Sequence, residues 1–390
     1  MKIVHACEKT IPIECDLRNA RVDFSEMTAT VVAVATDQFR DGRRVVGYAF
    51  NSFGRYACGG RWRALHPSPA GRAAVRPAGS GYAAARSAPR RGRAAAPRKA
   101  GAHAERSMAV GTLELALWDA AAKLEGRPLY QVLASRYGVA GAGRPRAIAC
   151  YAGGGFYKPT DDRARLRDEI QGYLDAGYRD VKIKAGGLPL AQDLARIESA
   201  LALLHDGSRL ALDASCAFDR DSALAYARAV APYGLRWLEE PCDPADFDTY
   251  RAVSEQYPGM LAGGENLYSK EEAENFLRYG PAPHRVVLQP DPPLAYGIGE
   301  FHRMVRLAGR HGVPAAHIMP HGGNLMSLHV AAGLGLGGAE SYPGLFGAFG
   351  GFGREVAIAD GHASLPAAPG IGFEEQPELY RIFAALPANP

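Results

Sequence analysis

Short apolar runs recur along the second half of the chain, and amphipathic, helix-length stretches such as 219–234 separate them. Four of the runs end in an acidic residue, and these acids, Asp213, Glu239, Glu265 and Asp291, stand 26 positions apart. A strand followed by a helix at this period is typical of the βα repeat of a parallel barrel or a doubly wound sheet. The runs are VKIK (181–184), RLALD (209–213), LRWLE (235–239), MLAGGE (260–265), RVVLQPD (285–291) and AAHIMPH (315–321).

The same pattern extends to both ends of the repeat. We expect AIACYAGGG (147–155) to be its first strand, 160–177 to be a capped helix, and GGAESY (337–342) to be its last strand. In a (β/α)8 barrel the C-terminal ends of the strands meet at one mouth, where the chemistry takes place. The repeat therefore predicts one cluster of polar side chains from distant positions.

The N-terminal region has a different pattern. Residues 1–53 predict an antiparallel meander, with a hairpin at Asp41-Gly42 between two β-rich runs. From 107 onward apolar residues follow helical spacing, and we expect the tail around 368–380 to fold back on the N-terminal sheet.

Composition excludes several classes of protein. The chain has 390 residues, 47% of them hydrophobic and 22% charged, as in ordinary globular proteins. No run approaches the ~18 apolar residues of a membrane span, and the charged N-terminus argues against a signal peptide, so we expect a cytoplasmic location and no membrane partner. The six scattered cysteines predict reduced thiols, without a disulfide framework or a zinc site.

The formal net charge of +4 depends on one segment. Residues 61–104 contain ten Lys or Arg residues and no Asp or Glu, whereas the rest of the chain is mildly acidic. Such a segment forms neither an amphipathic helix nor a core. It is either a basic linker for nucleic acid or anionic surfaces, or the product of two compensating frame errors between about codons 56 and 105. Translation of the gene in the other frames tests the second hypothesis, which the abrupt return of helical pattern near Glu105 favours.

The carboxylates of Asp213, Glu239 and Glu265 suggest a magnesium site. Mg²⁺ prefers hard oxygen ligands, and three clustered carboxylates repel one another unless a cation is present. A single carboxylate at a strand end is more often a helix cap or a surface ion pair. Three at equal spacing, each ending an apolar run, favour the metal.

Two further groups fit proton transfer. Lys182 and Lys184 alternate along a strand, so both side chains project to one face. Burial near a second ammonium and a dication lowers a lysine pKa there and makes a base. Asp291 on a neighbouring strand would orient His321 and favour its charged form, which makes a general acid. The alternatives are a solvated strand end for the lysines, a structural histidine and a turn-forming Asp291. Glu340 either lines the site from the last strand or only binds a loop.

The order of these motifs resembles the enolase superfamily in its mandelate racemase-like group. ALWDAAAKLEGRPLYQVL (116–133) is similar to a helix of that family's capping domain, and KIK, LDA, LEEP, GGEN, LQPD and the histidine follow in family order. The resemblance implies a (β/α)7β-type TIM barrel with an α+β capping domain formed by the N-terminal region and the tail. It divides the chain into 1–140, 141–355 and 356–390. It also implies Mg²⁺ as cofactor and a Lys or His base acting through an ene-diolate.

Among the members of this group, D-tartrate dehydratases are similar to several stretches of this chain, namely 18–34, 45–60, 320–343 and 369–374. This similarity implies that Lys184 abstracts the C2 proton of tartrate, that Mg²⁺ on the three carboxylates and Lys182 hold the ene-diolate, and that His321, oriented by Asp291, protonates the departing hydroxyl. Oxaloacetate would be the product. Candidate substrate contacts are Arg18, Asn19, Asn51, Arg55, Tyr56 and Glu340.

Two departures from the family pattern bear on function. This chain has Asp213-Ala214-Ser215 where the family commonly has Asp-Ala-Asn, and 61–104 stands where the family places a substrate-covering loop. We expect a small hydroxy-diacid substrate, no nucleic acid partner and a homo-oligomer. The alternatives are another acid-sugar dehydratase or racemase of the same fold, a nucleic-acid binder that acts through its basic segment, and a catalytically impaired barrel.

Overall fold

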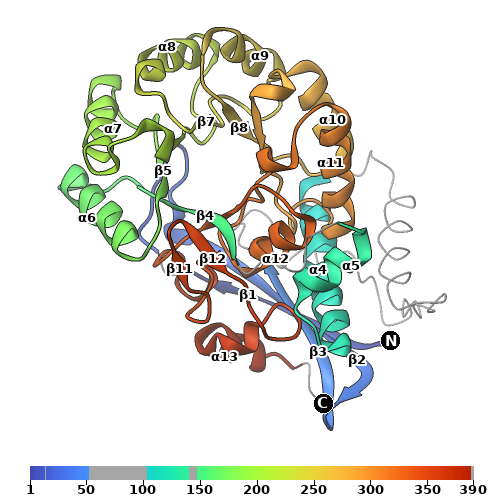
Figure 1. Ribbon diagram of the computed structural model, residues 1–390. Helices are drawn as coiled ribbons and strands as arrows, with labels where there is room; N and C mark the ends of the chain where they lie inside the picture. The colour runs from blue at the N-terminus through green and yellow to red at the C-terminus, as the bar shows by residue number, and fades with distance from the viewer. Residues whose placement is uncertain (14, 52–102, 140–146, 388–390) are drawn as a thin grey trace.

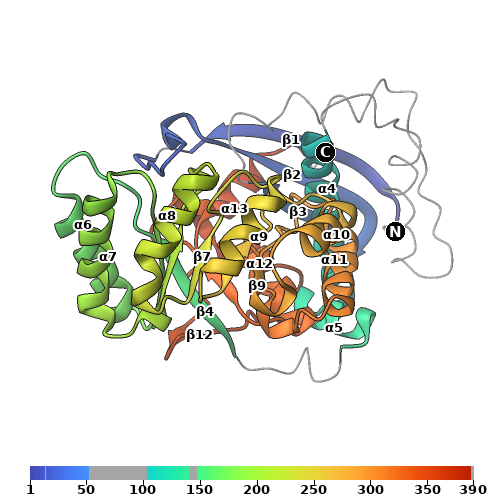
Figure 2. The ribbon, with the colours of Figure 1, turned by 90° about the horizontal axis from the view of Figure 1, so that it is seen from above.

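The computed structural model describes residues 1–13, 15–51, 103–139 and 147–387. A ring of strands with helices outside it lies beside a separate N-terminal sheet (Figure 1). Seen from above, the N-terminal strands lie across one end of this ring (Figure 2). The predicted substrate contacts Arg55 and Tyr56, and the basic segment up to residue 102, lie outside the described residues.

The N-terminal sheet is a three-stranded antiparallel meander, as the sequence predicts. Its strands β1 (Ile3–Pro12), β2 (Thr28–Arg40) and β3 (Arg43–Asn51) pair in chain order. Asp41 and Gly42 both have positive φ, at 49° and 74°, which forms the tight hairpin between β2 and β3. The helix α4 (His103–Glu125) packs so closely on β3 that a Cβ at Gly47 would lie 1.9 Å from the Ala116 carbonyl oxygen. Only glycine permits this approach.

The barrel follows the predicted repeat. Its parallel strands β4 to β9 pair in chain order, and β10 pairs in parallel with β4, so the first and last strands close the ring. The strands are β4 (Ala147–Gly154), β5 (Asp180–Lys184), β6 (Leu210–Asp213), β7 (Trp237–Glu239), β8 (Leu261–Gly263), β9 (Val286–Leu288) and β10 (Ala339–Ser341). The helices around them are α6 (Asp162–Asp175), α7 (Leu190–Leu204), α8 (Arg220–Val230), α9 (Phe247–Gln256), α10 (Lys270–Tyr279), α11 (Ile298–Arg310) and α12 (Leu325–Leu334). The predicted architecture, an N-terminal α+β region beside a barrel of parallel strands, is confirmed.

One expected strand is wrong. Residues 315–321 form a 3-10 helix, Ala315–His317, and then a single bridge between Ile318 and Leu288. Pro314 precedes this stretch and Pro320 lies within it, and proline lacks the N–H that a longer ladder requires. The bridge still fills the gap between β9 and β10, because Met319 N donates to the Leu288 oxygen and Gly337 N donates to the Ile318 oxygen.

The helical region also begins earlier than expected, since α4 starts at His103 rather than at 107. A second helix, α5 (Leu129–Tyr137), follows after the turn at Gly126. None of the helices within the described ranges combines the length and the apolarity that crossing a bilayer requires.

The C-terminal tail contacts both parts of the molecule. The short strands β11 (Ile358–Ala359) and β12 (His362–Ser364) add to the edge of β4, and α13 (Pro377–Ala384) stacks Phe383 on Tyr48 of β3 at 4.9 Å between ring centroids. The division of the chain at 140/141 and 355/356 stays a prediction.

Two buried polar side chains fasten the tail at Ile371. Asp119 of α4 accepts hydrogen bonds from Tyr48 N at 2.8 Å and from Ile371 N at 2.7 Å. His329 of α12 accepts from Tyr130 N at 3.1 Å through Nδ1, so its neutral ring carries the proton on Nε2, which donates to the Ile371 oxygen at 2.9 Å. Burial lowers the pKa of His329 to about 4, although the bond to the Ile371 oxygen opposes this shift.

The buried, neutral His329 ring makes the unfolding free energy fall as the pH is lowered. The folded state holds a neutral ring, so its contribution is complete above the ordinary pKa near 6.5 and is lost as the pH falls through about 4. The shift corresponds to about 3 kcal/mol of unfolding free energy. We expect chemical denaturation to show this loss between pH 6.5 and 4 in the wild type and a smaller loss in His329→Gln. Equal pH slopes for the two proteins would contradict it.

Candidate active site

A pocket of about 320 Å³ opens at the C-terminal ends of the barrel strands. The barrel and the N-terminal region both line it, the latter through the loop between β1 and β2. Of the residues singled out from the sequence, those lining the pocket are Asn19, Lys184, Asp213, Glu265, Asp291 and His321. Further lining residues that the sequence analysis missed include Arg21, Phe24, Phe156, Cys216, Glu240, Asn266 and Tyr342.

The Lys-x-Lys pair of β5 faces the barrel interior, as predicted. Both side chains are almost fully buried, Lys182 at 1% and Lys184 at 8% exposure. Lys184 Nζ contacts Asp213 Oδ2, while Lys182 Nζ lies 2.5 Å from Glu239 Oε1 and 2.7 Å from Glu340 Oε1. Adjacent strands bring these partners together, since Lys184 is paired with Asp213 in the β5–β6 register.

Neighbouring carboxylates determine the direction in which the pKa of Lys184 shifts. Burial lowers this pKa, but the Asp213 and Glu265 carboxylates together outweigh burial and raise it above the ordinary lysine value. The pKa of Lys182 is raised further, because burial is opposed by both Glu239 and Glu340. Each lysine is here the counter-charge of a carboxylate. The predicted lowering of the lysine pKa presupposes a dication beside these groups and stays a prediction.

The predicted metal carboxylates occupy the ends of three successive strands. Asp213 and Glu239 are the last residues of β6 and β7, whereas Glu265 lies two positions beyond β8. Both Glu239 oxygens are engaged, since Oε1 contacts Lys182 and Oε2 accepts from Trp237 Nε1 at 2.8 Å and from Gln289 Nε2 at 2.9 Å. Glu239 therefore lies beneath the pocket rather than on its surface.

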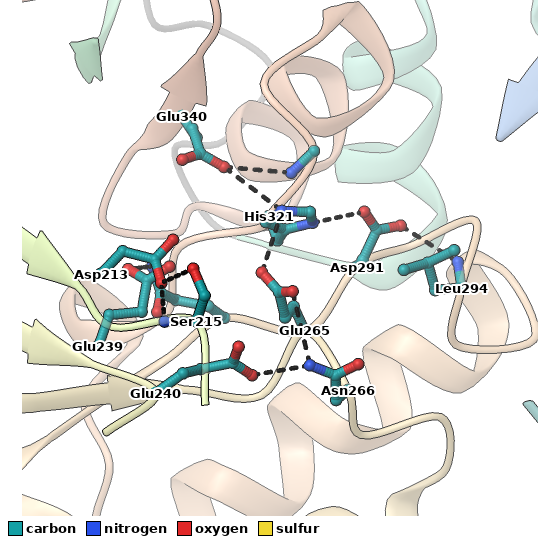
Figure 3. A network of polar contacts seen from close by, with 12 residues as sticks. Asp213, Ser215, Glu239, Glu240, Glu265, Asn266, Asp291, Leu294, His321 and Glu340 are labelled. Atoms are coloured by element: carbon teal, nitrogen blue, oxygen red, sulfur yellow. Dashed lines mark hydrogen bonds and ion pairs between the residues drawn. The ribbon is translucent and has the colours of Figure 1, made fainter. Parts of the chain in front are cut away.

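Glu240 is a fourth carboxylate that the sequence analysis missed. Its φ of 41° turns the chain after β7 so that its side chain lines the pocket, where Asn266 Nδ2 donates to it at 2.9 Å (Figure 3). Burial, followed by repulsion from Glu265 and Asp213, raises its pKa well above the ordinary value. Glu240 belongs to the LEEP motif that was read from the sequence. It was not chosen as a site residue because alternation along a strand assigns it to the opposite face from Glu239.

These carboxylates fit a hard divalent cation in their chemistry. Within the described ranges, no three Asp, Glu, His or Cys side chains already stand at the spacing of a bound ion. The lysine ammonium groups on Asp213 and Glu239 occupy oxygens that a cation would otherwise take. The donor set nevertheless consists of oxygens only, as Mg²⁺ prefers. The pKa of Glu240 is raised first by burial and then by repulsion from Glu265 and Asp213, a repulsion that a cation would relieve.

His321 and Asp291 form a contact in the predicted manner. His321 Nδ1 lies 2.9 Å from Asp291 Oδ2, and Nε2 lies 3.1 Å from Glu265 Oε2 (Figure 3). Burial opposes the charge on the imidazole, but Glu265 and Asp291 together raise the pKa of His321 to about 10. The ring is therefore positively charged at neutral pH and can donate a proton.

The predicted substrate contacts divide into three groups. Asn19 lines the pocket, although its Oδ1 accepts from Arg21 N and Val22 N, while Arg18 is exposed and pairs with Asp23 at 2.6 Å. Asn51 does not line the pocket and is buried, donating to Thr112 Oγ1 at 3.0 Å. Glu340 is fully buried on β10, where it contacts Lys182.

Ser215 shows how this chain accommodates its departure from the family pattern. It has a positive φ of 49°, a conformation that asparagine tolerates better than serine. Its N and Oγ both donate to Asp213 Oδ1, at 2.8 Å and 3.2 Å. Serine thus keeps a hydrogen bond that steadies the first carboxylate.

Known proteins match this chain in sequence and in fold. Residues 165–379 match the family model described as enolase C-terminal domain-like. The chain is 26% identical over 272 residues to arabinonate dehydratase of Saccharolobus solfataricus, covering 68% of this chain and 69% of that protein. It is 31% identical over 226 residues to L-talarate/galactarate dehydratase of Salmonella typhimurium, which is 57% of this chain but only about half, 52%, of that protein.

A crystal structure of the Salmonella typhimurium talarate/galactarate dehydratase, liganded with Mg and L-lyxarohydroxamate, superposes with a TM-score of 0.75 at 22% identity. The match covers 94% of this chain and 88% of that one, and it establishes the shared fold. The chain belongs to the enolase superfamily, in its mandelate racemase/muconate lactonizing group.

Proposed function

We propose that the protein is a Mg²⁺-dependent hydro-lyase that dehydrates a small hydroxy-diacid, with D-tartrate as substrate and oxaloacetate as product. The observation that carries this proposal is the pairing of a lysine and a positively charged histidine in one pocket, together with carboxylates suited to a metal. Dehydration of a hydroxy-acid requires a base for the carbon-bound proton and an acid for the departing hydroxyl.

Lys184 is the group that we assign as the base. Its side chain is buried at the end of β5 and still reaches the pocket. A base must be neutral, so Lys184 has to lose its proton and its contact with Asp213 before it accepts the proton at C2 of the substrate. The electrons of the broken C–H bond then move into the adjacent carboxylate, giving an ene-diolate.

His321 is the group that we assign as the acid. Its pKa of about 10 keeps the ring protonated, and Asp291 holds Nδ1. Nε2, which contacts Glu265 at 3.1 Å, would deliver a proton to the C3 hydroxyl, which departs as water. The resulting enol tautomerises to the keto-acid.

Asp213, Glu239 and Glu265 would hold the Mg²⁺, whose positive charge would offset the negative charge that builds up on the substrate carboxylate. Lys182 adds a second positive charge from the barrel interior and is kept there by Glu239 and Glu340. Glu340 then acts on Lys182 rather than on the substrate, which differs from its expected place among the substrate contacts.

The assignment of D-tartrate rests on sequence stretches that resemble D-tartrate dehydratases, including RNARVDF (18–24) in the pocket loop. The relatives named above act on larger acid sugars, so an aldarate or aldonate is the alternative substrate. A racemase of the same fold would need His321 as a second, neutral base, and the raised pKa of this residue favours the acid role. Assembly into a homo-oligomer stays a prediction.

A substrate panel tests the reaction. We expect Mg²⁺-dependent formation of oxaloacetate from D-tartrate and none from the other tartrate isomers. A coupled assay measures the keto-acid, and the same reactions with EDTA are the control. Turnover of an aldarate instead would change the substrate and keep the chemistry. If deuterium from the solvent entered the recovered substrate and no keto-acid formed, the protein would be a racemase and not a dehydratase. Salt-sensitive nucleic acid binding without turnover would favour the basic-segment alternative.

The role of Lys184 is open to a direct test. Lys184→Met should lower turnover at least about a hundredfold, as the loss of a general base does, while Mg²⁺ binding persists. Lys9→Met, at an exposed position on β1, is the matched control and should retain full activity. Retained activity in Lys184→Met would exclude Lys184 as the base.

Two adjacent glutamates distinguish the metal ligands. Glu239 is paired with Asp213 in the β6–β7 register and shares its face of the sheet, so Glu239→Gln should weaken Mg²⁺ binding by about tenfold or more. Glu240→Gln should weaken it less. Isothermal titration of both variants measures the order, and the reverse order would make Glu240 the ligand.

A further inference from the structure

A buried arginine lies behind the proposed base. Arg196 on α7 is 1% exposed, and its Nη1 donates to the main-chain oxygen of Lys184 at 2.7 Å. Its Nη2 donates to the oxygen of Gly155 at 2.6 Å. Its Nε contacts Asp162, and its guanidinium carbon lies 4.4 Å from the centre of the Tyr157 ring. The planar group is therefore fixed on all its edges and on one face.

Arg196 acts at the point where the β4–β5 ladder stops. The last paired residues are Gly154 and Ile183, and Arg196 joins the next residue of each strand, Gly155 and Lys184. Gly155 turns away with a φ of 62°, and a Cβ there would lie 2.5 Å from Ile183 Cβ. The strands consequently separate here, and a side chain continues their connection.

A second side chain from the same turn of α7 holds the residues after Lys184. Asp193, also 1% exposed, accepts from Gly186 N at 2.5 Å and from the Tyr226 hydroxyl at 3.1 Å. The Tyr157 hydroxyl donates to Asp193 at 3.0 Å and accepts from Gly187 N at 2.8 Å. The main chain is thus held at Lys184 and again two residues later.

We propose that Arg196 is a positioning residue that fixes the main chain of Lys184, and with it the place of Nζ in the pocket. The inference rests on the proposed function in that it takes Lys184 as the base. Lys184 must release Asp213 and approach a substrate carbon, so the side chain moves while its attachment stays fixed. A displacement of about 1 Å at such a group costs up to about a hundredfold in rate.

Substitution separates this role from a general effect on folding. In Arg196→Lys the charge remains, but one ammonium cannot bridge two carbonyl oxygens and Asp162. We expect kcat to fall about tenfold or more while KM, Mg²⁺ affinity and the fraction of folded protein change little. Arg196→Ala should lose more, and added guanidinium ion should restore part of its kcat at concentrations where ammonium of equal ionic strength does not. A cavity between α6 and α7 borders Arg196 and gives the ion a route.

Arg236 provides the matched control. It pairs with Asp180 at 2.7 Å, at the opposite end of the same strand β5. Arg236→Lys should leave kcat unchanged. A wild-type kcat in Arg196→Lys, or a loss that follows only the folded fraction, would overturn the proposal.

A measurement without substrate keeps the two proposals apart. Brief labelling with a lysine-reactive reagent, read by peptide mass spectrometry, gives the ratio of Lys184 to Lys182 modification. Lys182 is held by Glu239 and Glu340, so it serves as the internal reference. We expect the ratio to rise severalfold in the Arg196 variants and not in Arg236→Lys. An unchanged ratio would overturn the positioning role even where no substrate is turned over, whereas a changed ratio with no turnover by the wild type would reject the hydro-lyase alone.

Discussion

The pairing of β10 with β4 is the constraint on which the rest of the structure depends. Ala339 and Glu340 stand beside Cys150 and Tyr151, although nearly 190 positions separate them in the chain. This closure turns a row of strands into a ring, so that their C-terminal ends enclose a pocket instead of lining an edge. It also brings Glu340 of β10 to Lys182 of β5, on the other side of β4.

Charge balance within the ring determines the state of each site residue. Buried carboxylates at the ends of β6 and β7, beyond β8 and on β10 face two lysines and one histidine, all largely shielded from water. The lysines and the histidine are held charged by their acidic neighbours, while Glu240 is driven toward its neutral form. A cation bound among the carboxylates would take over the neutralisation of their charge and so lower the pKa of the lysines. Metal binding would thereby favour the neutral lysine that a base requires.

The sequence predicted much of the fold because strand-end acids at a fixed period report directly on a βα repeat. The meander, the first and last strands, the inward Lys-x-Lys pair and the His321–Asp291 contact all follow from local patterns. The prediction of a strand at 315–321 was wrong because it relied on the apolar composition of this stretch and gave too little weight to Pro314 and Pro320. Arg196 and Asp193 were not found, because on α7 they have the spacing of ordinary helix-surface charges. Only the tertiary structure shows that both point inward. The lowered lysine pKa stays a prediction, because it presupposes the cation that the site was inferred to bind.

Ile371 joins parts of the chain that are made far apart in time. During synthesis, β3 and α4 leave the ribosome long before the tail that supplies Ile371 to Asp119 and His329. The N-terminal sheet can form its own strands early, yet one oxygen of the buried Asp119 lacks this donor until residue 371 has emerged. The capping region is therefore translated before the barrel but completed only after the whole barrel has been made.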